Sequence, residues 1–207
     1  MYLRDLRKPS ANKNVYKFAS RKVGSVIMCE SSLEFDACFH HEYNENVVYF
    51  ESQPEGFHYQ INGKWNPYTP DALIQYKSGE CKLIEYKPFS KTQDINFQNE
   101  FKAKKAHAAL FGQELILVTE QQIRVNPILN NLKLLHRYSG ISCINELQST
   151  VLAFIQKSGK IAIRDIDTSS SLTLGELKAS ICLLLAKGLI KADIQNECLE
   201  SNPMVWC

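Results

Sequence analysis

The stretch that decides the fold runs from residue 66 to residue 90 and reads NPYTPDALIQYKSGECKLIEYKPFS. Two short runs rich in Tyr, Ile and Leu flank the segment KSGE at 77–80, a pattern typical of a β-hairpin. Pro70-Asp71 opens the first run, and Glu85-x-Lys87 ends the second. The stretch therefore predicts a hairpin with acidic residues near both strand ends and a lysine beside one of them.

Strand parity decides which of these side chains can meet. Side chains alternate between the two faces of a strand, so Glu85 and Lys87 share a face. A two-residue loop at 78–79 would pair position 71 with 86 and turn Asp71 away from Glu85. An odd-length loop, or one bulge, pairs Asp71 with 85 or 87 and brings all three together. We predict an odd-length loop or a bulge.

This trio suits metal-assisted phosphodiester hydrolysis. Two neighbouring carboxylates repel each other unless a proton or a divalent cation lies between them. Hard oxygen ligands suit Mg²⁺ or Mn²⁺, the cofactor that we expect here. An adjacent lysine can position the attacking water and stabilise charge on the phosphate. The alternative is a surface hairpin whose Asp71 and Glu85 are solvated and whose Lys87 pairs across strands.

Composition sets the outer limits. The 207 residues are 44% hydrophobic and 22% charged with a net charge of +2, as in an ordinary soluble protein with one large domain or a medium and a small one. Seven cysteines without a C-x-x-C pair support neither a disulfide framework nor structural zinc. The N-terminus is polar and basic, and no stretch approaches 18 apolar residues, so we expect a cytoplasmic protein without a signal peptide or membrane span.

Two basic clusters are candidates for contacts with DNA phosphates. The first 22 residues carry seven Lys or Arg against Asp5 alone and predict a loosely attached arm, for which a solvated tail is the alternative. The second cluster lies within a predicted helix at 94–110, where a solvated face is the alternative. The candidates are Arg4, Arg7, Lys8, Arg21, Lys22, Lys102, Lys104 and Lys105.

Glu34 has two interpretations. A helix is predicted from Ser31 to about Tyr43, and Ser31-x-x-Glu34 fits a capping box in which the carboxylate bonds to the N-cap amide. Alternatively, Glu34 points toward Asp71 as an additional metal ligand. One carboxylate cannot fully satisfy both roles.

The rest of the chain predicts two domains. Strands at 47–51 and 57–61 should form a meander with the hairpin, and a helix at 94–110 followed by a buried strand at 114–119 completes a β-β-α-β unit in an α/β sheet. A helix at 126–138 closes the domain 1–140. Residues 141–207 predict helices at 145–157 and 172–186 and a final hairpin, a winged-helix-like domain. Its presumed recognition helix has no Arg, which favours protein docking over DNA binding.

The chain resembles the restriction-endonuclease-like PD-(D/E)xK nucleases in Glu34, Pro70-Asp71, Glu85-x-Lys87 and the strand that follows. The order of these motifs, the Lys87-Pro88 ending and the winged-helix-like C-terminal domain resemble the TnsA family of transposon endonucleases. The resemblance implies a mixed sheet flanked by helices. It also implies that Asp71, Glu85, Glu34 and the Tyr86 carbonyl bind metal, and that Glu34, Asp71, Glu85 and Lys87 are catalytic.

The same resemblance implies a function and partners. The substrate is the double-stranded DNA of the transposon ends. TnsA cuts the 5′ ends, while the transposase TnsB cuts and joins the 3′ ends. The ATP-dependent regulator TnsC is expected to dock on the C-terminal domain, and the short length suggests the CRISPR-associated kind. The alternatives are a stand-alone restriction or repair nuclease of the same fold and a non-catalytic assembly factor with a vestigial site.

Overall fold

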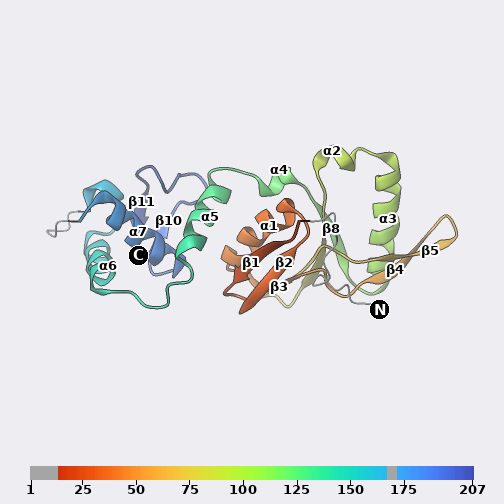
Figure 1. The fold of residues 1–207 in the computed structure, drawn as a ribbon, viewed down its shortest axis with the longest axis horizontal. Helices are drawn as coiled ribbons and strands as arrows, with labels where there is room; N and C mark the ends of the chain where they lie inside the picture. The colour runs from red at the N-terminus through yellow and green to blue at the C-terminus, as the bar shows by residue number, and fades with distance from the viewer. Residues whose placement is uncertain (1–13, 167–171) are drawn as a thin grey trace. The chain divides into compact units, whose positions relative to one another are not determined.

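The computed structural model describes residues 14–166 and 172–207, and the chain divides into two compact units after Arg124 (Figure 1). The sequence predicted this boundary after residue 140. The division falls earlier because helix α5 (Ile128–Tyr138) packs against α7 (Leu174–Ala186) of the second unit. The predicted closing helix of the first domain therefore belongs to the second.

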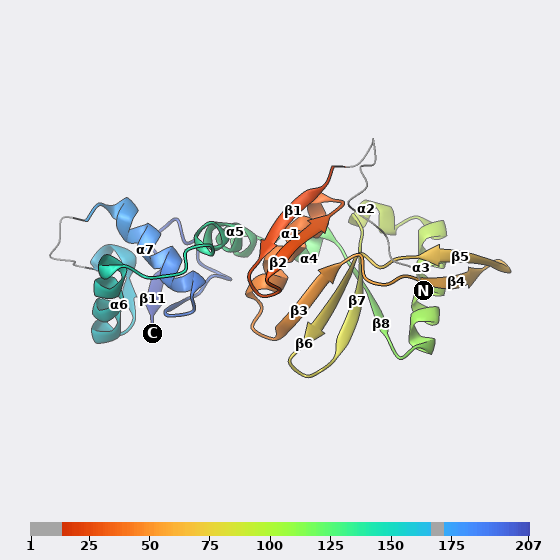
Figure 2. The same ribbon diagram turned by 60° about the horizontal axis from the view of Figure 1, so that its bottom comes forward.

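The first unit is built on a mixed sheet with the strand order β3-β6-β7-β8 (Figure 2). Strands β3 (Val47–Ser52), β6 (Ala72–Tyr76) and β7 (Cys81–Tyr86) are antiparallel in turn, and β8 (Glu114–Val118) runs parallel to β7. Helices flank this sheet, which confirms the predicted mixed α/β fold and its β-β-α-β unit. Strand β8 is an edge strand with only Leu115 fully buried, not the buried strand expected from its apolar run.

The β6–β7 hairpin has the predicted parity. Gln75 pairs with Cys81, so the five residues 76–80 lie between them, and the Tyr76 N–H donates to the Glu80 carbonyl. Gly79 takes a φ of +85°, which a residue without Cβ adopts at little cost. The register continues through Ala72 and Ile84, so Asp71 and Glu85 follow next to each other at the end of the ladder.

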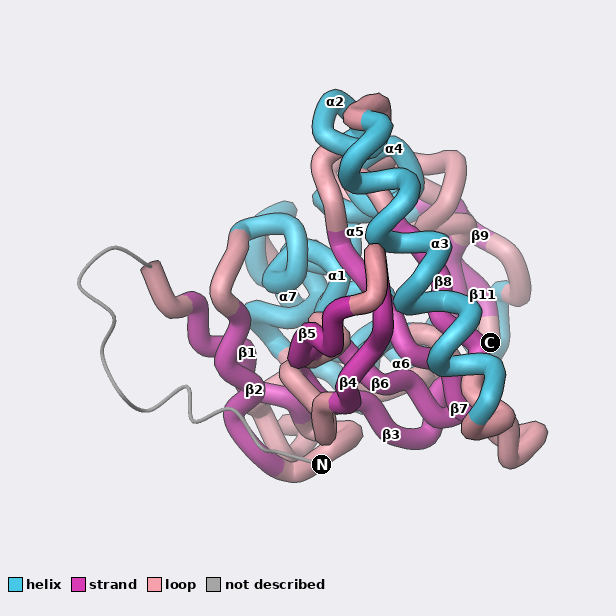
Figure 3. The backbone as a smooth tube through the Cα atoms, turned by 90° about the vertical axis from the view of Figure 1, so that its right-hand side faces the viewer, coloured by secondary structure: helices cyan, strands magenta, loops and turns pink. Residues whose placement is uncertain are grey.

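Strands β4 (Phe57–Ile61) and β5 (Lys64–Tyr68) form the hairpin expected from Asn62-Gly63, but not a meander with the main sheet. They pair with each other as a separate two-stranded sheet. Helix α3 (Ile95–Leu110) packs against β4 and β8, as Figure 3 shows. A short helix, α2 (Phe89–Thr92), connects β7 to α3. The hairpin thus meets the sheet through α3 and its own side chains.

The prediction that the N-terminal segment is a loosely attached arm is wrong from residue 14 onward, where the structure begins. Strands β1 (Tyr16–Ser20) and β2 (Ser25–Cys29) form a hairpin in front of α1 (Ser32–Tyr43). Phe18 is 1% exposed, and its ring lies edge-on to Phe39 and Phe50. A buried aromatic side chain anchors this segment to the core, which a count of basic residues could not reveal.

Helix α4 (Glu120–Ile123) packs against α1.

The second unit comprises α5, α6 (Glu146–Ser158), α7 and a small antiparallel sheet with the order β10-β11-β9. Its strands are β9 (Ile161–Ala162), β10 (Lys191–Ala192) and β11 (Met204–Trp206), with a 3₁₀ turn at Ile163–Asp165. Val151, Ile155, Leu184 and Val205 are fully buried in its core. The winged-helix assignment remains a prediction. Across the described ranges, no helix combines the length and hydrophobicity needed to cross a bilayer.

Candidate active site

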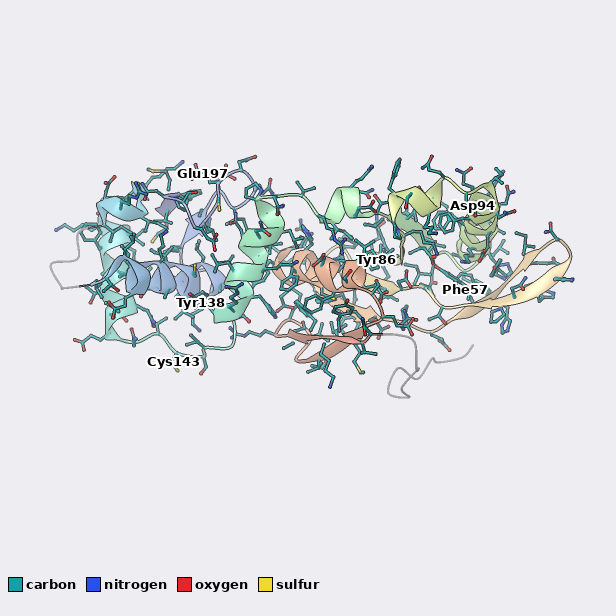
Figure 4. The ribbon with its side chains drawn as sticks, turned by 45° about the horizontal axis from the view of Figure 1, so that its top comes forward. Phe57, Tyr86, Asp94, Tyr138, Cys143 and Glu197 are labelled. Atoms are coloured by element: carbon teal, nitrogen blue, oxygen red, sulfur yellow. The ribbon has the colours of Figure 1, made fainter. Side chains whose placement is uncertain are left out.

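An open cleft lies at the end of β7 in the first unit, with a volume of about 580 Å³. Figure 4 labels Tyr86, the last residue of this strand, and Asp94, where α3 is capped. The predicted site residues Glu34, Asp71, Glu85, Tyr86 and Lys87 all line this cleft. The structure therefore brings together side chains that lie up to 53 positions apart in the sequence (from 34 to 87).

Asp71 is held by the backbone around it. Its Oδ2 accepts a hydrogen bond of 2.8 Å from the Tyr86 N–H. Its own N–H donates to the Ile84 carbonyl and its carbonyl accepts from the Gln53 N–H. These bonds to β7 and to the end of β3 fix the position of the carboxylate relative to Glu85.

The electrostatics of Asp71 are unfavourable for a bare carboxylate. Burial and the charges of Glu85 and Glu34 raise its pKa to about 8, although the Tyr86 N–H and Lys87 act in the opposite direction. The combined negative charge of Asp71, Glu85 and Glu34 thus exceeds what the Lys87 ammonium offsets. A bound divalent cation would supply the missing positive charge.

Glu85 is buried and carries a hydrogen bond to one of its two oxygens. The Tyr68 hydroxyl donates to Glu85 Oε2 over 2.6 Å. Burial and the Glu85 charge raise the pKa of Tyr68 far above its usual value, so the hydroxyl keeps its proton and remains a donor. The other oxygen, Oε1, makes no hydrogen bond within the described chain and belongs to a residue that lines the cleft.

Glu85 and Lys87 share a face of the sheet, as predicted. Leu83 packs on this face with Tyr68 and with Ala108 of α3, and the Lys87 ammonium lies 5.2 Å from the centre of the Phe97 ring of the same helix. The Lys87 N–H donates to the Val118 carbonyl of β8. The lysine is therefore anchored by its backbone, while its side chain is at the cleft.

Tyr86 points to the opposite face, toward α1. Its hydroxyl shares a hydrogen bond of 2.6 Å with His41 Nε2. Burial lowers the pKa of His41 to about 3 and raises the pKa of Tyr86 well above its usual value, so both groups are neutral in the physiological range. This pair locks the end of β7 to α1 without adding charge to the site. The metal-binding role of the Tyr86 carbonyl stays a prediction.

Glu34 forms half of the predicted capping box: Ser31 caps its N–H, but its carboxylate bonds to the Glu30 N–H and the Ser31 hydroxyl and not to the N-cap amide. Its Oε1 accepts from the Ser31 hydroxyl over 2.7 Å and its Oε2 from the Glu30 N–H over 3.0 Å, while Ser31 Oγ accepts from the Glu34 N–H. Each oxygen accepts a hydrogen bond, and Glu34 also lines the cleft, so its role as a metal ligand stays a prediction. Glu34 still contributes negative charge to Asp71.

The donor set fits a hard cation only in part. Asp71 and Glu85 each have one oxygen engaged in a hydrogen bond and one left for a cation, and oxygen donors suit Mg²⁺ or Mn²⁺. No group of three or more His, Cys, Asp or Glu side chains is placed to hold a metal within residues 14–166 and 172–207. A cation here would be held by Asp71 and Glu85, with water and phosphate oxygens completing its coordination.

Comparison with known proteins points to the same chemistry. Residues 44–120 match the family model described as TnsA-like endonuclease N terminal. This part of the chain resembles TnsA-like endonucleases. Asp71, Glu85 and Lys87 lie inside the match, whereas Glu34 and the second unit lie outside it. No curated protein matches the chain.

The structure places the predicted DNA contacts of the first unit in different surroundings. Arg4, Arg7 and Lys8 lie outside the described residues, and Lys102 and Lys105 are exposed on α3. Lys104 is buried, with its ammonium 2.8 Å from Glu100, so it must be removed from the set.

The remaining two candidates lie in the β1–β2 turn. The Lys22 ammonium donates to the carbonyls of His41 and Asn44 at the end of α1, where a cation satisfies carbonyls without helical partners, so Lys22 also has a structural role. Arg21 is exposed, and its N–H donates to Glu42.

Sequence reasoning missed other residues of the cleft. Lys91, Glu120 and Arg124 line it. The Arg124 guanidinium donates to Asp36 Oδ2 over 2.8 Å and to the Ser32 hydroxyl over 2.9 Å, which fixes its direction. Nothing in the local sequence marks Glu120 and Arg124, because they reach the cleft through the packing of α4 on α1, whereas Lys91 lies on α2 just after β7. Tyr68, which bonds to Glu85 but does not line the cleft, had one signal: it lies three residues before Asp71 in the deciding stretch.

Proposed function

We propose that the first unit is a metal-dependent DNA endonuclease domain and that the protein cuts the 5′ ends of a transposon. The observation that carries the proposal is the convergence of Asp71, Glu85 and Lys87 at the end of β7, inside the region that matches the TnsA-like family. The same unit carries exposed cations for the phosphate backbone. Two carboxylates and a lysine at one strand end suit metal-assisted phosphodiester hydrolysis.

The residues divide the work as follows. Asp71 and Glu85 would hold a divalent cation, which when bound would polarise the scissile phosphate and lower the pKa of a water. Lys87 orients the attacking water and stabilises charge that develops on the phosphate oxygens. The attacking water loses a proton to solvent and its oxygen bonds to phosphorus as the P–O3′ bond breaks, and the leaving 3′ oxygen takes up a proton from solvent. The products are a 3′-hydroxyl and a 5′-phosphate.

Cations at the rim of the cleft fit the negatively charged backbone of the DNA. Lys91 and Arg124 line the cleft itself, and Arg124 is held in place by Asp36. An arginine with a fixed guanidinium suits phosphate oxygens better than a mobile one, because less side-chain entropy is lost on binding. These contacts read no base sequence. The protein therefore depends on a partner to select the transposon end.

We assign partner binding to the second unit. By resemblance the transposase is TnsB and the regulator is TnsC, and the presumed recognition helix of the second unit lacks Arg. Nicking should accordingly be weak on the isolated protein and strong in the assembled system.

The test is a reconstituted transposition reaction with mapped strand cuts. With the partner proteins and Mg²⁺, the wild type should give breaks at the 5′ and 3′ ends, and Asp71→Ala should give 3′ cuts only and joined cointegrate products. Efficient plasmid nicking by the isolated protein would support a stand-alone nuclease instead. Unchanged excision by Asp71→Ala would support an assembly factor with a vestigial site.

A further inference from the structure

A series of side-chain contacts runs from α3 through the β4–β5 hairpin to Glu85. The Lys104 ammonium lies 2.8 Å from Glu100 Oε1 and 4.3 Å from the centre of the Tyr68 ring. The Tyr59 hydroxyl donates to Glu100 over 2.9 Å, and the Tyr68 hydroxyl donates to Glu85 over 2.6 Å. Two tyrosines of one hairpin thus each bond to a carboxylate, but only Tyr68 bonds to a carboxylate that lines the cleft.

We propose that Tyr68 is a positioning residue for the nuclease site: its hydroxyl holds Oε2 of Glu85 so that Oε1 stays directed at the cation shared with Asp71. This inference rests on the proposed function, because it needs a cation at Asp71 and Glu85. It adds a residue that touches neither DNA nor metal but sets the metal affinity.

The physical reason is the freedom of a glutamate side chain. The last torsion of Glu rotates in a broad, roughly two-fold well, so an untethered carboxylate presents its oxygens in many orientations. A hydrogen bond to one oxygen removes most of that freedom before the cation binds. Tyr68 is 6% exposed and Glu85 7% exposed, so water has little room to replace the hydroxyl. Loss of an outer partner of a metal ligand typically costs about 10- to 100-fold in metal affinity.

Tyr68 is itself held from two sides. The Phe57 ring of the paired strand lies at 5.2 Å in an edge-on arrangement, and the buried Lys104 ammonium lies over the face of the phenol. A cation over an aromatic ring is attracted to its electron density. It also draws density from the phenol oxygen, which makes the hydroxyl a stronger donor to Glu85. Lys104, predicted from the sequence to bind DNA, thus acts inside the protein.

The position of the hairpin follows from the same contacts. Strands β4 and β5 are not hydrogen-bonded to the main sheet, yet Tyr59 and Tyr68 are buried with Leu83 of β7 and Ala108 of α3. Within the described residues the hairpin is therefore docked on the sheet by side chains and not by strand pairing, with Tyr68 at its last position. Placing the donor at the end of β5 puts it opposite the end of β7, where Glu85 lies.

The experiment compares Tyr68→Phe with the matched control Tyr59→Phe in the full chain. Each variant removes one hydroxyl that donates to a carboxylate and should lose about 1 kcal/mol in urea unfolding, with the smaller loss for Tyr59→Phe because its bond to Glu100 is only part-buried. Mn²⁺ binding is measured by calorimetry, and the Mg²⁺ dependence of 5′ cutting is measured in the reconstituted reaction. Tyr68→Phe should raise both half-saturating metal concentrations about 10- to 100-fold, with cutting largely restored at high Mg²⁺. Tyr59→Phe should change them less than about 3-fold.

A double-mutant cycle with Glu85→Gln tests whether Tyr68 affects the metal affinity through Glu85. If Tyr68 acts through Glu85, adding Tyr68→Phe to Glu85→Gln should weaken Mn²⁺ binding no further. An additive loss, or equal metal affinities for Tyr68→Phe and Tyr59→Phe while the wild type binds Mn²⁺ and cuts, overturns the inference and leaves the proposed function intact. A wild type that neither binds Mn²⁺ nor cuts with its partners overturns the proposed function itself.

Discussion

The backbone N–H of Tyr86 donates a 2.8 Å hydrogen bond to the side chain of Asp71, and so joins two residues from neighbouring strands at the point where their ladder ends. This bond engages one oxygen of Asp71 and leaves the other for a cation. It also stabilises the ionised carboxylate in a place where burial and two acidic neighbours oppose ionisation. The site is thus arranged around a charge that the protein alone does not neutralise.

Asp71→Ala should abolish 5′ cutting while the protein stays folded. Loss of a direct ligand should cost more than loss of an outer partner, so the rate should fall at least about 100-fold. Strand-specific mapping of reconstituted reaction products measures this, with circular dichroism as the folding check. Cutting at more than a tenth of the wild-type rate would remove Asp71 from the metal site.

The stability of the metal-free protein should fall as pH rises from about 4 to about 8. The pKa of Asp71 is about 8 in the folded state and near its ordinary value of 3.8 in the unfolded chain, so between these values the folded state binds more protons and loses stability with rising pH. Asp71→Asn lacks this loss. In EDTA, its advantage over the wild type should be at least about 1 kcal/mol larger at pH 8 than at pH 4.5. An advantage that does not change with pH would contradict the raised pKa.

Added Mg²⁺ should reverse that loss. Because a cation binds the ionised carboxylates, the increase in Tm on adding Mg²⁺ should be larger at pH 8 than at pH 5. Asp71→Asn and Glu85→Gln should show little increase at either pH. Differential scanning fluorimetry at fixed ionic strength, with Ca²⁺ as a second cation, measures this. An equal increase in the wild type and both variants would place the bound cation elsewhere.

Substitutions of the α3 lysines should affect DNA binding where the lysine is exposed and stability where it is buried. Lys102→Gln and Lys105→Gln should leave stability nearly unchanged and lower the slope of DNA affinity against salt by about 0.9 for each DNA phosphate that the variant no longer neutralises. Lys104→Gln should instead cost about 1–3 kcal/mol of stability, because it removes a buried ammonium that pairs with the part-exposed Glu100 and lies over the Tyr68 ring. Fluorescence anisotropy across a salt series and urea unfolding distinguish the two effects. A salt-slope change from Lys104→Gln without destabilisation would restore this lysine to the DNA-binding set.

Asn131→Ala should destabilise the second unit alone. The Asn131 side chain is 1% exposed, donates to the carbonyls of Ile194 and Glu197 and accepts from the Leu199 N–H. Removing it leaves buried backbone groups without partners and should cost about 2–4 kcal/mol. Metal binding by the first unit should be unchanged. Calorimetry of the full chain, with Mn²⁺ titration in parallel, checks both.

The sequence predicted the elements whose signals are local. The turn residues and parity of 66–90 gave the β6–β7 register, and Ser31 and Glu34 gave the start of α1. The β1–β2 hairpin was missed because Phe18 lies among basic residues, and only its packing on Phe39 and Phe50 shows that it is part of the core. The boundary was misplaced because α5 has the same pattern whichever unit it packs on.

The candidate site was predictable in its main residues and not in its surroundings. Asp71, Glu85 and Lys87 followed from strand geometry. The orientation of Glu34 did not, because a capping box and a metal ligand have the same sequence pattern. The roles of Tyr68, Lys104 and Arg124 depend on contacts between segments far apart in the chain, which neither periodicity nor spacing contains.

The bond between His41 and Tyr86 has a consequence for how this protein has evolved. The two side chains take no part in the proposed chemistry, yet their bond fixes Tyr86, the residue between Glu85 and Lys87 in the chain. A substitution at only one of the two positions would leave the other side chain with a buried polar atom that has lost its hydrogen-bond partner. We therefore expect the two residues to change together. Among relatives, positions 41 and 86 should be inherited as a unit, and a lineage that replaces the histidine by an apolar residue should also have exchanged the tyrosine for phenylalanine.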